Sequence, residues 1–351
     1  MRHLPPLLFA CLLALLAAAA LPDARATETD QFTLPPQPLD DLGPDLAAIV
    51  RKILRDEIAR LNARISGQRT QVQSEVAPDP IDERELLRHI FEETGIGIPE
   101  TTIERAIHYG AFPGRTVRFM PSLNDSIYAW TLSPFPFSHL WDCPTIRLYG
   151  IDLGTDKIGH IFQQGYDYVT RFMDDREKGK DEAAAIASAV EYGVAEEKAL
   201  NGIMLTGVYS NGDLAGNYAG FKFYRNIFHE VRIGDRILPP ILRREGAHWI
   251  IDPNRDNPEL LKPFVSEHLN EAFNPSFHLF SVDVIRSHVR DRCASWFAQY
   301  PDFDEAGYRA KLQRLKTWFG EPYGWELPED KSVSMLECFG PAKSPARVDP
   351  R

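Results

Sequence analysis

An acid, an imidazole and an amide share one face of a predicted helix. In the stretch GTDKIGHIFQQGY, Asp156, His160 and Gln164 follow one another at intervals of four residues. An acid in a first helical turn and an Asp–His pair four residues apart are also ordinary features of a helix start. The apolar residues around His160 indicate burial, however, and a buried imidazole needs polar partners. The stripe is therefore a candidate site.

Two further predicted helices carry polar residues at inward positions. Glu197 lies on the apolar stripe of the helix expected over 181–206, and Asp213 and Asn217 share a face of the helix expected over 212–229. Each has an ordinary explanation: a carboxylate at the stripe's edge, a first-turn acid and a satisfied core amide. Consecutive helices with short connections pack antiparallel, so we expect these residues to meet the Asp156 stripe in one polar pocket.

Glycines recur on the third of these helices. Gly212, Gly216 and Gly220 follow at intervals of four, and each costs about 1 kcal/mol of helix propensity relative to Ala. Such a stripe favours close approach of a neighbouring helix.

This combination of side chains suits hydrolytic acid/base chemistry or a hard or borderline divalent metal ion. In a hydrolase of an ester, amide or phosphoester, His160 would act as general base. Asp156 or Glu197 would orient it, and Lys157 with Asn217 would bind a phosphate or carbonyl oxygen. The candidate catalytic residues are Asp156, His160, Glu197, Asp213 and Asn217, and the candidate ligand-binding residues are Lys157, Gln164 and Tyr224.

The same groups could instead form a satisfied hydrogen-bond network that fixes helix register. The protein would then bind an envelope-derived or other small-molecule ligand, or serve a structural role. We favour this binding or structural role and keep the hydrolase as the alternative. The sequence does not decide whether a metal is bound.

The ordered set resembles a known pattern. Asp156-Lys157-x-x-His160, then Glu197, then Asp213-Leu214-x-x-Asn217-x-x-Gly220 resembles the VanZ-like family and its small envelope relatives. That family carries DKxxHF, a Glu and D-L/I-x-x-N-x-x-G on successive helices. The resemblance implies a cell-envelope protein from a family associated with tolerance of glycopeptides directed at the cell wall. The resemblance supports the candidate site more strongly than it supports any particular reaction.

The N-terminus has the pattern of a secretory signal peptide over residues 1–26. Arg2 and His3 precede an apolar run, and Ala24-Arg25-Ala26 provides a small-x-small cleavage site. No later stretch reaches the length of apolar sequence that a membrane helix needs. We therefore predict a periplasmic or secreted protein whose mature chain has no transmembrane span.

Composition excludes one class of partner. The 351 residues include 39 Lys and Arg against 50 Asp and Glu, a net charge of -11, which disfavours nucleic-acid binding. The hydrophobic share of 44% is enough for a large core. Oligomeric state is left open.

Periodicity predicts a mainly α fold, a multi-helix bundle with a few short strands and long loops rich in Pro and aromatic residues. After an extended leader over 27–44, in which we expect no chemistry, a single helical domain covers 45–339, with possible sub-layers 45–150 and 151–339, and a polar tail covers 340–351. Helices are expected at about 45–65, 83–93, 99–109, 156–178, 181–206, 212–229, 281–300 and 304–319, short strands within 110–150, and a strand at 248–251.

Three further features of the sequence are the cysteines, one polar run and one aromatic cluster. Of the pairs that Cys143, Cys293 and Cys338 could form in an oxidising compartment, we favour Cys293 with Cys338. The polar run Glu267–Pro275 is interpreted as helix caps rather than a cleft lining. The last cluster forms either a wall for a sugar or acyl chain or a self-packed loop: Tyr128, Trp130, Phe135, Phe137 and Trp141.

Overall fold

The computed structural model describes residues 28–71, 83–96, 101–122, 124–129, 131, 143–199, 202–204 and 206–340. Helices predominate and short strands form small sheets, as expected for a mainly α chain. The expected signal peptide lies outside the described residues, as does the tail beyond Gly340. Trp130, Phe135, Phe137 and Trp141 of the aromatic cluster also lie outside them.

The helices follow the predicted order closely. They are α2 (Gly43–Gln71), α3 (Glu83–Thr94), α4 (Thr102–Tyr109), α5 (Asp156–Gly159), α6 (Gly165–Glu177), α7 (Glu182–Lys198), α8 (Asn211–Phe228), α9 (Val282–Gln299) and α10 (Glu305–Leu315), with the short 3₁₀ turns η3 (Lys262–Phe264), η4 (Glu267–Leu269) and η5 (Met335–Cys338). The helix expected to continue to residue 206 ends at Lys198, because Ala199 leaves the helical region of backbone space.

The first helix of the candidate site contains a π-helical segment. η2 (His160–Gln164) joins α5 to α6, so the chain is helical from Asp156 to Glu177, with one wider turn beginning at His160. Such π segments within α-helices are rare and frequently occur at functional sites.

Within the described residues the strands form four small antiparallel sheets. The largest has the order β1-β2-β3, and the others pair β4 with β9, β5 with β6 and β7 with β8. Their bounds are β1 (Arg118–Phe119), β2 (Thr145–Leu148), β3 (Ile151–Gly154), β4 (Val208–Tyr209), β5 (Val231–Ile233), β6 (Arg236–Leu238), β7 (Leu242–Glu245), β8 (His248–Ile251) and β9 (Phe277–His278). The strand expected at 248–251 is confirmed as β8.

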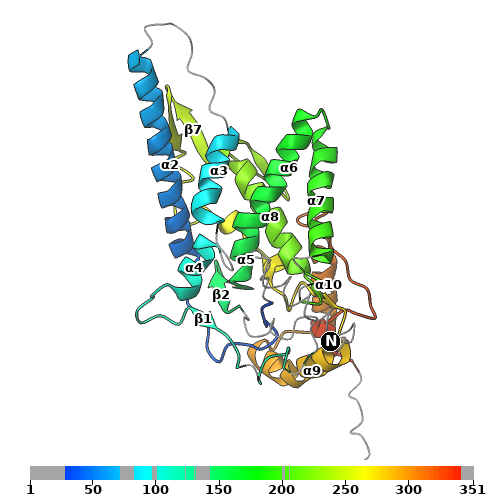
Figure 1. The fold of residues 1–351 in the computed structure, drawn as a ribbon. Helices are drawn as coiled ribbons and strands as arrows, with labels where there is room; N and C mark the ends of the chain where they lie inside the picture. The colour runs from blue at the N-terminus through cyan, green and yellow to red at the C-terminus, as the bar shows by residue number, and fades with distance from the viewer. Residues whose placement is uncertain are drawn as a thin grey trace, which may run out of the picture.

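Helix α8 lies at the centre of the helical layer. Figure 1 shows it between α3 and α7, behind α6, with the long α2 at the edge beside β7. Nearly every residue of α8 is buried, as expected for a helix that neighbours cover on all sides. Apolar residues of α2 to α8 form one large core around it, and a smaller core joins Phe32 to α9, α10 and η5.

The glycine stripe on α8 permits close helix contact, as predicted. A Cβ on Gly220 would lie 2.0 Å from the carbonyl oxygen of Ile161 and 2.9 Å from Cα of Gly165. A Cβ on Gly216 would lie 2.9 Å from Cβ of His160. The backbones of α8 and η2 therefore approach to a separation that only glycine allows.

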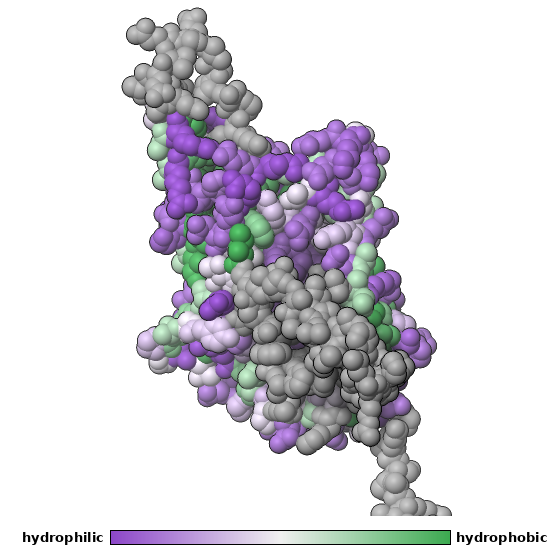
Figure 2. Space-filling view, viewed as in Figure 1, coloured by the Kyte–Doolittle hydropathy of each residue, from purple (hydrophilic) through white to green (hydrophobic). Residues whose placement is uncertain are grey.

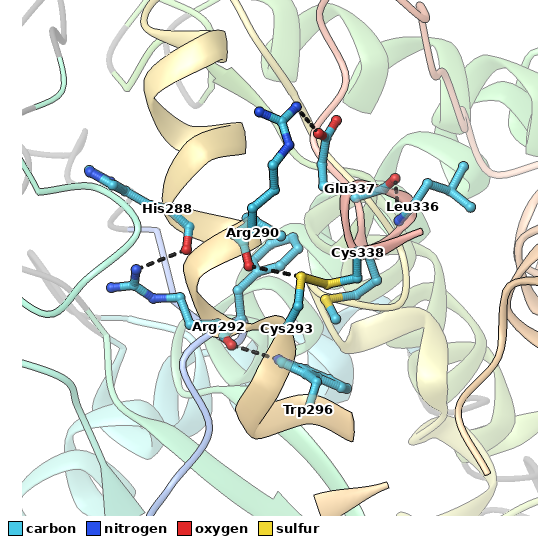
Figure 3. Close-up of a disulfide and its surroundings, with 12 residues drawn as sticks. His288, Arg290, Arg292, Cys293, Trp296, Leu336, Glu337 and Cys338 are labelled. Carbon is cyan, nitrogen blue, oxygen red and sulfur yellow. Dashed lines mark hydrogen bonds and ion pairs between the residues drawn. A yellow bond between two sulfur atoms is a disulfide. The ribbon is translucent and has the colours of Figure 1, made fainter. Parts of the chain in front are cut away.

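The disulfide between Cys293 and Cys338 is confirmed. It joins α9 to η5 with a Cα–Cα distance of 5.4 Å, and Figure 3 shows the Arg290–Glu337 ion pair beside it. Cys143 is buried elsewhere, in the strand region.

None of the described helices combines the length and apolarity needed to cross a membrane. In the view of Figure 2, hydrophilic residues cover most of the described surface over α2, α3 and the upper ends of α6 and α7.

Candidate functional site

The ammonium group of Lys157 lies between three carboxylates. Its Nζ is 2.6 Å from Oδ2 of Asp156 and 2.5 Å from Oε1 of Glu271, and it also contacts Oδ1 of Asp213. The lysine side chain has no exposed surface, and the three acids are buried. We call Asp156, Lys157, His160, Asp213, Asn217 and Glu271 the buried polar centre.

Local sequence explains how the carboxylates reach Lys157. Ser210 caps α8 by accepting a hydrogen bond from the backbone N–H of Asp213, which fixes this acid in the first turn. Gly212 follows the start of the same helix, and a Cβ there would lie 2.9 Å from Cε of Lys157 and 2.7 Å from Oε1 of Glu271. Because Gly212 has no side chain, there is space for the contact between Lys157 and Glu271.

Both ring nitrogens of His160 contact side chains of α8. Its Nδ1 lies 2.9 Å from Oδ1 of Asn217, and its Nε2 lies 3.2 Å from Oδ2 of Asp213. Burial alone would lower the pKa of His160, but the negative charge of Asp213 outweighs it and raises the pKa to about 9. The ring is therefore an imidazolium at neutral pH and donates to both partners.

The pKa values of Lys157, Asp213 and Glu271 are also shifted by burial and by the neighbouring charges. Burial opposes the charge of Lys157, but the nearby carboxylates, Asp156 first, hold its pKa above the usual range. Burial likewise opposes the charge of Asp213, yet the cations His160 and Lys157 hold its pKa below the usual range. Burial raises the pKa of Glu271. The centre is thus a compensated cluster of charges.

Hydroxyl groups complete the hydrogen bonding of the carboxylates. Thr29 donates to Oδ1 of Asp156 at 2.8 Å. Ser210 donates to Oε1 of Glu271, and Ser276 donates to its Oε2, each at 2.7 Å. Acceptor oxygens that the lysine does not reach are therefore satisfied, as a buried ionic network requires.

The N-terminal segment takes part in this network. Thr29 contacts Asp156, and Glu28 is buried near the same charges, with its hydroxyl partner Thr206 at 3.0 Å. Burial, reinforced by the charge of Asp213, raises the pKa of Glu28 well above its usual range. A sequence rich in Pro gave no signal of this role, because no helical or strand periodicity marks the segment.

Glu197 lies beside the buried polar centre rather than within it. Its Oε1 accepts a hydrogen bond from the backbone N–H of Ser210 at 2.8 Å, and it is 2% exposed. Burial and the charge of Asp213 raise the pKa of Glu197 to about 8. The side chain points inward, as its position on the apolar stripe indicated.

A small cavity separates Glu197 from the imidazole. Its volume is about 10 Å³, and it is lined by His160, Gln164, Tyr168, Glu197 and Asn217, among others. This is room for about one water molecule. Oε1 of Gln164 and the hydroxyl of Tyr168 form no hydrogen bond of good geometry among the described residues, although Tyr168 lies close to Asn217. A water molecule in this cavity would hydrogen-bond to both of these atoms.

The structure places the remaining predicted residue elsewhere. Tyr224 is buried two turns beyond Asn217 on α8, and its hydroxyl donates to the carbonyl oxygen of Phe162 at 2.7 Å. It thus lies apart from the buried polar centre. Glu271 is the member that sequence reasoning missed, although the polar run Glu267–Pro275 contains it; no regular periodicity directs its side chain inward.

Three ligand atoms of the centre could hold a metal ion. One atom each from Asp156, His160 and Asp213 lies within 4.8 Å of the others, and all three residues are buried. Two carboxylates and an imidazole suit a borderline divalent ion. Lys157 contacts both of these carboxylates, however, and an ion would compete with its ammonium group for them.

Comparisons with protein-family models, curated proteins and solved structures found no match to this chain. The resemblance to the VanZ-like family therefore rests on the residues from Asp156 to Gly220 and stays a prediction.

Proposed function

We propose that the protein is a ligand-binding or structural component of the cell envelope, in which the buried polar centre is architectural. One observation carries this proposal: Lys157 is wholly buried among three carboxylates, and the cavity beside His160 has room for about one water. A cavity of this size has no room for a substrate beside the imidazole. The centre instead ties α5, η2, α8, the N-terminal segment and the loop of Glu271 together.

The protonation states support the same role. A general base must be neutral at the working pH, whereas Asp213 raises the pKa of His160 to about 9. Both ring nitrogens are also engaged as donors to residues of α8. The imidazolium is suited to holding two side chains together and poorly suited to accepting a proton.

The envelope location rests on the predicted signal peptide and is supported by the disulfide. Disulfides persist in oxidising compartments, and Cys293–Cys338 is formed between separate elements. N-terminal sequencing of secreted material, together with fractionation of expressing cells, tests the location. Material retained in the cytoplasm with an intact N-terminus would contradict it.

The architectural role is tested with His160→Gln, and with Glu191→Gln on the exposed face of α7 as the control. We expect His160→Gln to lower the melting temperature while the control does not, because only His160 joins two elements. Model esters, amides and phosphoesters should show no turnover that depends on His160. Turnover that His160→Gln abolishes in a folded protein would overturn the proposal.

A metal-dependent hydrolase is the second candidate, and the grouping of Asp156, His160 and Asp213 favours it. A bound divalent ion would supply a Lewis acid and activate water there. Adding Mg²⁺, Mn²⁺ or Zn²⁺ to the purified protein distinguishes the two. If the ammonium of Lys157 takes the place of a metal ion, none of these ions should raise the melting temperature. Stoichiometric binding of one of them would favour the hydrolase.

A further inference from the structure

A second and much larger cavity lies away from the buried polar centre. This cleft has a volume of about 600 Å³ and is formed by the N-terminal segment, strands β2 and β3, η4 and the residues after it, and helices α9 and α10 with their linker. None of the six residues of the centre lines it. Its size falls in the usual range for a small-molecule site, 300 to 1,000 Å³ by order of magnitude, about that of a drug-sized ligand.

Aromatic rings form one wall of the cleft. The ring of Trp296 packs 5.2 Å from that of Tyr300 and 5.7 Å from those of Phe273 and Phe303, measured between centroids. Trp296 is buried and forms the base of the wall, whereas the other three rings are partly exposed. The wall therefore offers fixed, accessible aromatic surface to a ligand.

Both cations of the cleft are already paired, and its charged groups are acidic on balance. Arg147 forms two hydrogen bonds with Asp152, at 2.7 and 2.8 Å, and Lys311 lies 2.5 Å from Glu267. Four acids line the cleft against these two bases: Asp152, Glu267, Asp302 and Asp304. The excess of negative charge disfavours phosphates and carboxylates as ligands.

Two buried polar groups at the cleft have unmet hydrogen-bonding capacity. Nε2 of Gln31 and Oγ1 of Thr145 have no partner among the described residues, and both side chains are more than nine-tenths buried. Gln31 cannot turn its amide around, because its Oε1 accepts the backbone N–H of Glu271 at 2.6 Å. Leaving such groups unsatisfied is unfavourable. Both atoms lie beneath the surface of the cleft, so they mark its polar end without themselves facing a ligand.

We propose that this cleft binds an uncharged saccharide. A sugar ring offers C–H faces that stack on Tyr300 and hydroxyl groups that reach carboxylate and amide partners. Asp152 and Glu267, held in place by their cations, line the cleft and have lone pairs that accept hydrogen bonds from sugar hydroxyls. This inference rests on the proposed binding function and names its ligand class and its site.

The test measures binding of maltose, cellobiose and N,N′-diacetylchitobiose to the purified protein by titration calorimetry. Cellobionic acid, which matches cellobiose in size but carries a carboxylate, reports on charge. We expect at least one uncharged disaccharide to bind and the acid to bind more weakly than cellobiose. Tyr300→Ala should weaken binding about tenfold or more, since it removes a stacking ring. Tyr109→Ala, an exposed ring on α4, is the control and should leave binding unchanged.

Three outcomes would overturn the inference: no binding of any of the three sugars, binding that Tyr300→Ala leaves unchanged in a folded protein, or tighter binding of cellobionic acid than of cellobiose. Failure here is distinguishable from failure of the proposed function. Turnover dependent on His160 would contradict the architectural role of the centre. If His160→Gln lowers the stability but no sugar binds, only the saccharide site in the cleft is contradicted.

Discussion

The ammonium of Lys157 and the carboxylate of Glu271 meet at 2.5 Å with both side chains buried, although one residue begins a helix and the other lies in an irregular segment far along the chain. Asp156 and Asp213 complete the surroundings of the same cation. Removing one partner from such a cluster leaves uncompensated charge inside the protein, so the cluster should dominate the effects of substitution.

Lys157→Met should lower the free energy of unfolding by about 3–5 kcal/mol, because it leaves three carboxylates buried without their cation. Urea unfolding followed by circular dichroism measures the loss. Lys198→Met is the control: its pair with Glu326 is nearly half exposed, and its removal should cost at most about 1 kcal/mol. Equal effects of the two substitutions would show that the buried polar centre does not stabilise the fold.

Stability should fall as the pH rises above neutrality. The pKa of His160 is raised from 6.5 to about 9, so the folded state holds a proton that the unfolded state releases. The contribution is complete below pH 6.5 and is lost as the pH passes 9. Glu197, with its pKa raised from 4.5 to about 8, adds a loss that begins at lower pH. Unfolding free energies measured from pH 5 to pH 9 should show the decline.

Glu197→Gln separates these two contributions. The amide keeps the shape of the protonated acid, so the decline between pH 5 and pH 6.5 should disappear, while the part of the decline between pH 6.5 and pH 9 that belongs to His160 remains. Glu191→Gln, an exposed acid on the same helix, should leave the whole profile unchanged. A flat wild-type profile would show that neither group changes its proton binding on unfolding.

Gly220→Ala should destabilise the protein by about 1–3 kcal/mol, since the new methyl group would lie 2.0 Å from the carbonyl oxygen of Ile161. Gly307→Ala in α10 is the control, because the nearest atom there is the movable carboxylate of Asp304 at 3.0 Å. Thermal unfolding compares the two. A Gly220→Ala protein as stable as wild type would mean that α8 and η2 can separate at little cost.

Reduction of the Cys293–Cys338 disulfide should lower stability by about 2–4 kcal/mol, as expected for a cross-link spanning 45 residues. The melting temperature with and without reductant measures this. Cys338→Ala should be destabilised by a similar amount and should no longer respond to reductant. Loss of the reductant effect in Cys143→Ala instead would show a different pairing.

Local sequence was sufficient to predict the helices, their order and much of the site. The spacing of Asp156 and His160, and of Asp213 and Asn217, assigned each pair to one helix face, because a helical repeat places residues four apart side by side. The glycine stripe indicated the close approach of α8 in the same way. These features depend on periodicity, which the chain carries within a few turns.

Only the tertiary structure decided what those faces meet. Glu271 contacts Lys157, and the charge of Glu28 acts on it from nearby; both lie in segments without helical or strand periodicity, so no local pattern could place them. The charge of His160 likewise depends on its distance from Asp213, and the aromatic cleft depends on how α9 and α10 lie against the N-terminal segment. The sequence by itself determined which residues share a helix; long-range packing determined which charges are neighbours, because electrostatic interactions depend on separation in space and not along the chain.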